Sequence, residues 1–176
     1  MRRFLITSMA LISVVAISSP ASAARLRAYE GETSAGTRID FLIRVADDGR
    51  LSLKEMYIKV ELLCEDASAI EYRSWWGFGG VGRRLEGRRL ELDLVFGAEA
   101  LHVAGVFRSR TADGTYKNTQ ATLTDAEDAQ LCTTGDLTWT ADRVPRDRLP
   151  ELDARIEGVV IRHVDDHVVQ RVANLG

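Results

Sequence analysis

The sequence is poor in cysteine and histidine and carries no net positive charge. It contains two cysteines and three histidines among 176 residues, and its formal net charge is −3. Because proteins bind nucleic acid mainly through clustered positive charge, this balance gives no support to a nucleic-acid-binding role. Three histidines also leave few strong ligands for a transition metal. We therefore expect no nucleic-acid partner, no cofactor and no metal ion.

Familiar catalytic motifs are missing as well. There is no G-x-S-x-G nucleophile motif, and the serines after Ala23 stand in no recognisable arrangement with a histidine. Two carboxylates could serve a glycosidase, but among 26 acidic residues some pair is always available. His163 and His167 are spaced four apart, as metal ligands on a helix would be, but no clear third ligand accompanies them. We assign no catalytic residue, and the sequence favours a non-enzymatic role.

Long apolar runs are absent except near the start. Arg2 and Arg3 precede the apolar run Phe4 to Ile17, and Ala21-Ser22-Ala23 then supplies the small residues of a signal-peptide cleavage site. The run is shorter than the roughly 20 apolar residues that a membrane-spanning helix needs. We expect a cleavable signal peptide over residues 1–23, a periplasmic or extracellular location, and no membrane span after cleavage.

The two cysteines, Cys64 and Cys132, both follow the expected cleavage site. An even number of cysteines in an exported chain is typical of disulfide pairing. We therefore predict one disulfide between Cys64 and Cys132, with two buried free thiols as the alternative.

Apolar and polar residues alternate through most of the chain, as they do in half-buried strands. In "RLELDLVF", for example, Leu90 and Leu92 lie in one phase and Glu91 and Asp93 in the other. In "LSLKEMYIKVELLC" the phase changes near Lys54-Glu55, which predicts a β-bulge.

About eight such segments, with turn signals every 8–12 residues, predict an all-β fold. We expect an antiparallel β-sandwich, jelly-roll-like, over residues 24–144. The residues from 145 to 176 form a C-terminal extension, in which Val160, Val164, Val168 and Val172 recur four apart. This spacing predicts an amphipathic helix, and a hairpin that turns at Asp165-Asp166 is the alternative.

The segment "SWWGFGGVG" from Ser74 to Gly82 contains the pattern G-x-G-x-x-G. No helix pattern follows it, so the glycines favour a wide turn between strands over a dinucleotide site. Alternation through "AIEYRSWW" places Tyr72, Ser74 and Trp76 on one face of a strand, so we predict that Trp76 points into the core and Trp75 away from it. An outward indole can stack on a ligand, so Trp75 is our candidate ligand contact; the alternative is that Trp75 covers part of the sheet.

The order of several short motifs carries a resemblance. After "YEGETSAGTRIDF" come a D-G turn, a strand that ends in Cys64, then "GVF", "DGTY" and the closing segment "CTTGDLTWTA". The closing segment has the pattern C-x-x-G-x-x-x-W-x-A, and its last fixed positions are Trp139 and Ala141. This arrangement resembles a group of small exported bacterial β-sandwich domains with one cysteine pair. The resemblance covers Tyr29 to Ala141, excludes the extension and implies no activity.

These observations lead to an expected function. We expect a non-catalytic binding or structural domain that acts outside the cytoplasm, on a glycan or a cell-surface protein. A hydrolase or an enzyme inhibitor with a site built from loops is the alternative. A cleft with convergent buried polar groups would favour that alternative, and clustered exposed aromatic side chains would favour the first.

Overall fold

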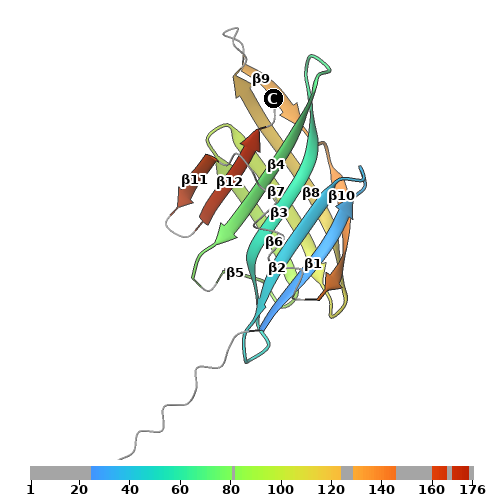
Figure 1. Ribbon diagram of the computed structural model, residues 1–176, viewed down its shortest axis with the longest axis vertical. Helices are drawn as coiled ribbons and strands as arrows, with labels where there is room; N and C mark the ends of the chain where they lie inside the picture. Colours follow the sequence, from blue (N-terminus) through green and yellow to red (C-terminus); the bar gives the residue numbers. More distant parts are fainter. Residues whose placement is uncertain (1–24, 81, 124–128, 146–159, 166–167, 175–176) are drawn as a thin grey trace, which may run out of the picture.

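The computed structural model describes residues 25–80, 82–123, 129–145, 160–165 and 168–174, and every regular element in these ranges is a β-strand (Figure 1). The strands are β1 (Arg25–Thr33), β2 (Arg38–Val45), β3 (Leu51–Cys64), β4 (Ala69–Phe78), β5 (Arg83–Arg84), β6 (Arg89–Phe96), β7 (Glu99–Phe107), β8 (Thr111–Leu123), β9 (Ala129–Thr133), β10 (Leu137–Val144), β11 (Val160–Asp165) and β12 (Val168–Asn174). Nothing in these ranges forms a helix that is long and apolar enough to cross a membrane. The expected signal peptide lies outside the described residues.

The strands pair into one antiparallel sheet that closes on itself, so the predicted β-sandwich is wrong. Around the circuit, β3 pairs with β2, β2 with β1, β1 with β10, β10 with β8, β8 with β9, and β9 again with β3. In a sandwich, two separate sheets meet only through side chains. The fold is therefore a closed six-stranded antiparallel β-barrel with additional strands.

The additional strands extend the sheet from the two longest strands of the circuit. On the other edge of β3, β4 is followed by β12 and β11, while β7 and β6 follow from β8 (Figure 1). The short strand β5 also pairs with β3. Tyr72 on β4 donates a hydrogen bond to Glu99 on β7, so inward side chains of the two extensions meet.

The core is formed by the inward side chains of the circuit and of both extensions. Four aromatic rings lie together in it, with centroids 4.7 to 6.0 Å apart: Tyr29, Phe41, Phe107 and Trp139. The indole of Trp139 lies against the backbone of β7, where a Cβ atom at Gly105 would be 2.4 Å from the ring. The tryptophan of the closing segment is thus a core residue, and a glycine on β7, two strands away in the sheet, makes room for it.

The predicted bulge in β3 is confirmed. Leu42 of β2 pairs with Glu55, but the next residue, Ile43, pairs with Leu53, so Lys54 is the extra residue. Because of this slip, both the earlier and the later apolar residues of β3 reach the same core.

The helix predicted for the C-terminal extension is wrong, and the hairpin alternative describes the strands that are present. β11 and β12 pair with each other in antiparallel register, and β12 continues the sheet by pairing with β4. The turn itself, at residues 166–167, lies outside the described residues. β-branched residues disfavour a helix and favour a strand, and the edge of β4 supplies the partner that the sequence does not reveal.

Candidate functional site

The Cys64–Cys132 disulfide is confirmed, and it joins two strands of the circuit. Cys64 is the last residue of β3 and directly opposes Cys132 on β9. Their Cα atoms are 3.9 Å apart, closer than the 4.4–6.8 Å that is usual for a disulfide. The bond is consistent with an oxidising compartment outside the cytoplasm.

The two tryptophans of "SWWGFGGVG" point to opposite faces of β4, as the alternation predicted. Trp76 is 1% exposed and belongs to the core, whereas Trp75 lies on the other face and is 9% exposed. The Trp75 indole Nε1 lies 3.3 Å from Glu55 Oε2, to which it donates, and its ring covers the backbone of Gly77. Most of the Trp75 ring therefore contacts the protein itself. Its assignment as a ligand contact stays a prediction.

Gly77 lies within β4, and Gly79, Gly80 and Gly82 follow in a turn that is attached to β3. The ammonium group of Lys54, the extra residue of the bulge, donates to the carbonyl oxygens of Phe78 (3.1 Å) and Gly80 (2.8 Å). Gly82 has a φ of +82°, in the left-handed region that favours glycine, and a Cβ there would be 2.4 Å from the carbonyl oxygen of Leu53. Strand β5 follows, and not the helix of a dinucleotide site. The turn interpretation is confirmed.

A group of polar side chains lies inside the fold, between β4, β7 and β8. The Glu99 side chain at the start of β7 is 3% exposed. Its Oε1 atom accepts hydrogen bonds from the Tyr72 hydroxyl at 2.5 Å and from the Asn118 amide at 3.1 Å. A carboxyl group is costly to bury unless donors surround it, and these two contacts supply donors from both sides.

Four buried polar atoms on β4 and β8 make no hydrogen bond of normal geometry within the described structure, although the Asn118 side chain lies close enough to the Tyr116 hydroxyl, and the Ser74 side chain close enough to the Tyr72 hydroxyl, to lower the pKa of each tyrosine. The four atoms are Ser74 Oγ, Trp76 Nε1, Tyr116 Oη and Asn118 Oδ1, and each belongs to a residue that is at most 1% exposed. Leaving a buried donor or acceptor without a partner costs about 1–3 kcal/mol per group. We call the six residues Tyr72, Ser74, Trp76, Glu99, Tyr116 and Asn118 the interior polar cluster.

Both tyrosines of the interior polar cluster remain protonated over the whole physiological range. Burial raises the pKa of Tyr72 far above its usual value, and the neighbouring Glu99 carboxylate raises it further. Burial likewise raises the pKa of Tyr116; the contact with Asn118 lowers it in part, and Glu99 adds to the rise. Both phenols are therefore neutral, and that of Tyr72 donates its proton to Glu99.

The alternation pattern of the sequence predicted only part of the interior polar cluster. It placed Tyr72, Ser74 and Trp76 on one face of a strand, but it assigned no role to Glu99 or Asn118. The signal was available for Glu99, since it shares the parity of Leu101 and Val103 on β7. A charged residue at an inward-facing position of a strand indicates a buried polar site. Because Glu99 stands beside a turn, its inward position was not recognised.

The two buried tyrosines provide a matched pair of variants. In the ligand-free protein, Tyr72→Phe should lower the free energy of unfolding by about 1–3 kcal/mol, because the Glu99 carboxyl group loses a buried donor. Tyr116→Phe should leave the free energy unchanged or raise it, because it removes a hydroxyl group that makes no hydrogen bond of normal geometry within the described structure. Urea denaturation measures both. An equal loss at the two positions would contradict this assignment.

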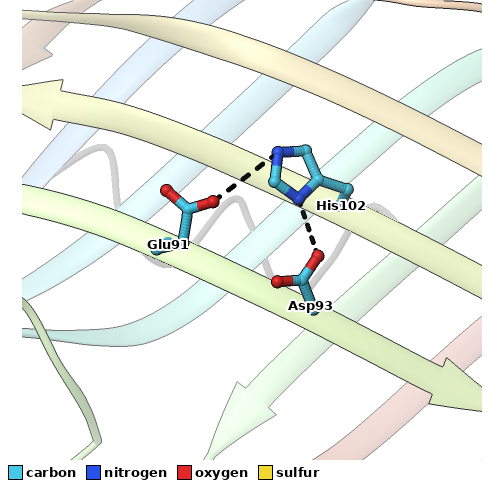
Figure 2. A group of neighbouring side chains, drawn as sticks. All are labelled: Glu91, Asp93 and His102. Atoms are coloured by element: carbon cyan, nitrogen blue, oxygen red, sulfur yellow. Dashed lines mark hydrogen bonds and ion pairs between the residues drawn. The ribbon is translucent and has the colours of Figure 1, made fainter.

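A second group of polar side chains lies on the outer face of β6 and β7 (Figure 2). The imidazole of His102 lies between two carboxylates: Nδ1 is 2.7 Å from Asp93 Oδ1, and Nε2 is 3.9 Å from Glu91 Oε1. Of the other two histidines, His163 is in β11 and its side chain is not described, and His167 lies outside the described residues. The i, i+4 pair expected on a helix is thus not supported, since the helix is not present.

Comparison with protein-family models, with curated proteins and with solved structures finds no match to this chain. Of the resemblance to small exported domains, the structure supports the Cys64–Cys132 bond and the all-β fold, and it replaces the sandwich with a closed barrel.

Proposed function

We propose that this chain is a non-catalytic binding domain that acts outside the cytoplasm and holds a small polar molecule at the interior polar cluster. The observation that carries the proposal is the set of four buried polar atoms on β4 and β8 that make no hydrogen bond of normal geometry within the described structure. Barrels of about eight strands, which are wider than this circuit of six, can hold one small ligand among their inward side chains. A bound molecule that completes these hydrogen bonds would offset the cost of burying the groups.

The chemistry of the four atoms defines the class of ligand. The Trp76 indole can only donate a hydrogen bond, Asn118 Oδ1 can only accept one, and the Ser74 and Tyr116 hydroxyls can do either. A matching molecule therefore carries both donors and acceptors, as hydroxyl and amide groups do. The rings of Tyr72, Trp76 and Tyr116 would provide apolar contact beside these groups.

The placement of Ser74 and His102 gives no support to a serine hydrolase built from these two residues. Ser74 lies inside the fold, while His102, the one histidine whose side chain the structure describes, lies on the outer face. A serine hydrolase requires the two side chains within hydrogen-bond reach of each other. For this pair of residues the fold excludes that arrangement.

The proposal is tested by titrating the oxidised protein with N-acetylglucosamine, glucose and acetamide as probes. We expect a hydroxyl- or amide-bearing probe to raise the melting temperature and to shift amide resonances of β4, β7 and β8. A probe at about 100 times its dissociation constant would add about 2.7 kcal/mol to the free energy of unfolding. The double variant Ser74→Ala/Asn118→Ala should lose the response.

Trp75→Ala is the matched control, since it removes an aromatic side chain from the opposite face of β4. It should leave the response to the probes intact. Loss of binding in Trp75→Ala alone would place the ligand on the outer face and overturn the interior site. Resonance shifts in none of the three titrations would count against a small polar ligand altogether.

A further inference from the structure

Two neighbouring strands bring an imidazole and two carboxylates together on the outer surface. On β6, Glu91 and Asp93 are two residues apart and so point to the same face. His102 on β7 directly opposes Asp93 in the antiparallel register. Figure 2 shows all three side chains converging above the two strands.

The geometry is close to that of a metal site. One ligand atom from each residue lies within 4.8 Å of the other two. Two atoms bound at about 2.1 Å to one tetrahedral zinc ion are about 3.4 Å apart, so rotations of exposed side chains would be enough to close the site. The side chains are accessible, with exposures of 72% for Glu91, 72% for Asp93 and 39% for His102.

We propose that Glu91, Asp93 and His102 bind a divalent transition-metal ion, of which Zn²⁺ is the best match. Imidazole selects zinc, copper or nickel over calcium and magnesium, which prefer oxygen ligands alone. The ion would take one imidazole nitrogen and one oxygen from each carboxylate, and water would complete its coordination. This site is separate from the interior polar cluster and does not depend on the function proposed above.

The strand backbone holds the three ligands in place, and cations lie around them. Two hydrogen-bonded strands fix the backbone at all three positions, which limits the rearrangement that binding requires. Arg83, Arg84 and Arg89 line the same surface hollow as Glu91 and Asp93, and Lys117 opposes His102 on β8. The Lys117 ammonium group is 3.1 Å from Asp136, so its charge is partly neutralised there. Binding requires a neutral imidazole and therefore displaces any proton that His102 carries.

Zinc titration of the full chain, followed by calorimetry and by amide resonances, tests the proposal. The parent protein is the double variant His163→Ala/His167→Ala, in which His102 is the one remaining histidine. We expect one zinc ion per chain, with resonance shifts centred on β6 and β7. Adding His102→Ala should weaken zinc binding by at least about tenfold, and Asp93→Asn should weaken it by a similar factor.

Glu61→Gln is the matched control, because it removes one exposed carboxylate from β3, away from the site. It should leave the affinity for zinc unchanged. The proposal is overturned if the parent protein binds no zinc up to about 1 mM, an affinity limit of about 4 kcal/mol. It is also overturned if the parent binds zinc but His102→Ala binds it equally well. Far-UV circular dichroism will show that each variant keeps its strands.

Discussion

Trp76→Ala is expected to lower the free energy of unfolding by about 3–5 kcal/mol, the usual cost of truncating a tryptophan in a core. Trp76 is 1% exposed and is one of the largest buried side chains of the described structure. Its removal leaves a cavity beside β3, to which β4 is paired at this position through Met56. Urea denaturation of the oxidised protein measures the change.

Trp75→Ala is the control with which the stability loss of Trp76→Ala is compared. Trp75 lies on the opposite face of the strand, where its ring covers Gly77 and its indole donates to Glu55. Trp75→Ala should cost about 1.5–3 kcal/mol, the value for losing one buried apolar side chain. A loss as large as that of Trp76→Ala would mean that the outer face of β4 is packed as tightly as the core. A loss near zero would mean that the Trp75 contacts contribute nothing to stability.

The double variant Cys64→Ala/Cys132→Ala is expected to lose about 4 kcal/mol of stability, the chain-entropy value for a loop of about this length. The bond joins residues 68 positions apart and therefore restricts a large part of the unfolded chain. Equilibrium unfolding in denaturant, with the wild-type protein kept oxidised, gives the difference.

Chemical reduction of the wild-type protein is the control for the double variant. Because both treatments remove the same covalent constraint, they should produce the same loss within error. If reduction destabilises the protein but the double variant is as stable as the oxidised wild type, the effect comes from the free thiols and not from the loss of the loop. A loss below about 1 kcal/mol by both routes would contradict the entropic argument.

The sequence determined the local features well because they depend on one strand at a time. The alternation of Leu90 and Leu92 with Glu91 and Asp93 placed the first pair in the core and the second on the surface. The change of phase at Lys54 predicted the bulge because a one-residue slip moves every later side chain to the other face.

The closure of the sheet could not be predicted in the same way. A strand with one buried face has the same pattern in a sandwich and in a barrel, because the pattern does not say which strand lies next to it. The decisive contacts are those of β9, which pairs both with β3 and with β8. The C-terminal extension raised the same difficulty. Valines four apart are compatible with an amphipathic helix, but β12 instead forms a strand that pairs with β4.

Only half of the interior polar cluster could be predicted from the sequence, for a related reason. Tyr72, Ser74 and Trp76 share one strand, so their common face could be read from the sequence. Their relation to Glu99 and Asn118 depends on β7 and β8 lying opposite β4, which is a property of the closed fold. Candidate sites that span several strands therefore require the topology before they can be recognised.

Strand β6 ends the sheet, and the character of this strand bears on how copies of the protein behave at high concentration. Among the described residues its long pairing is with β7 alone, so its other edge presents backbone groups that a strand from a second molecule could join. The carboxylates of Glu91 and Asp93 oppose such stacking, since two copies in register would bring like charges together. Val95, which is 75% exposed, carries no charge and presents apolar surface on the same strand. An ion that neutralised the two carboxylates would therefore make edge-to-edge pairing between copies easier.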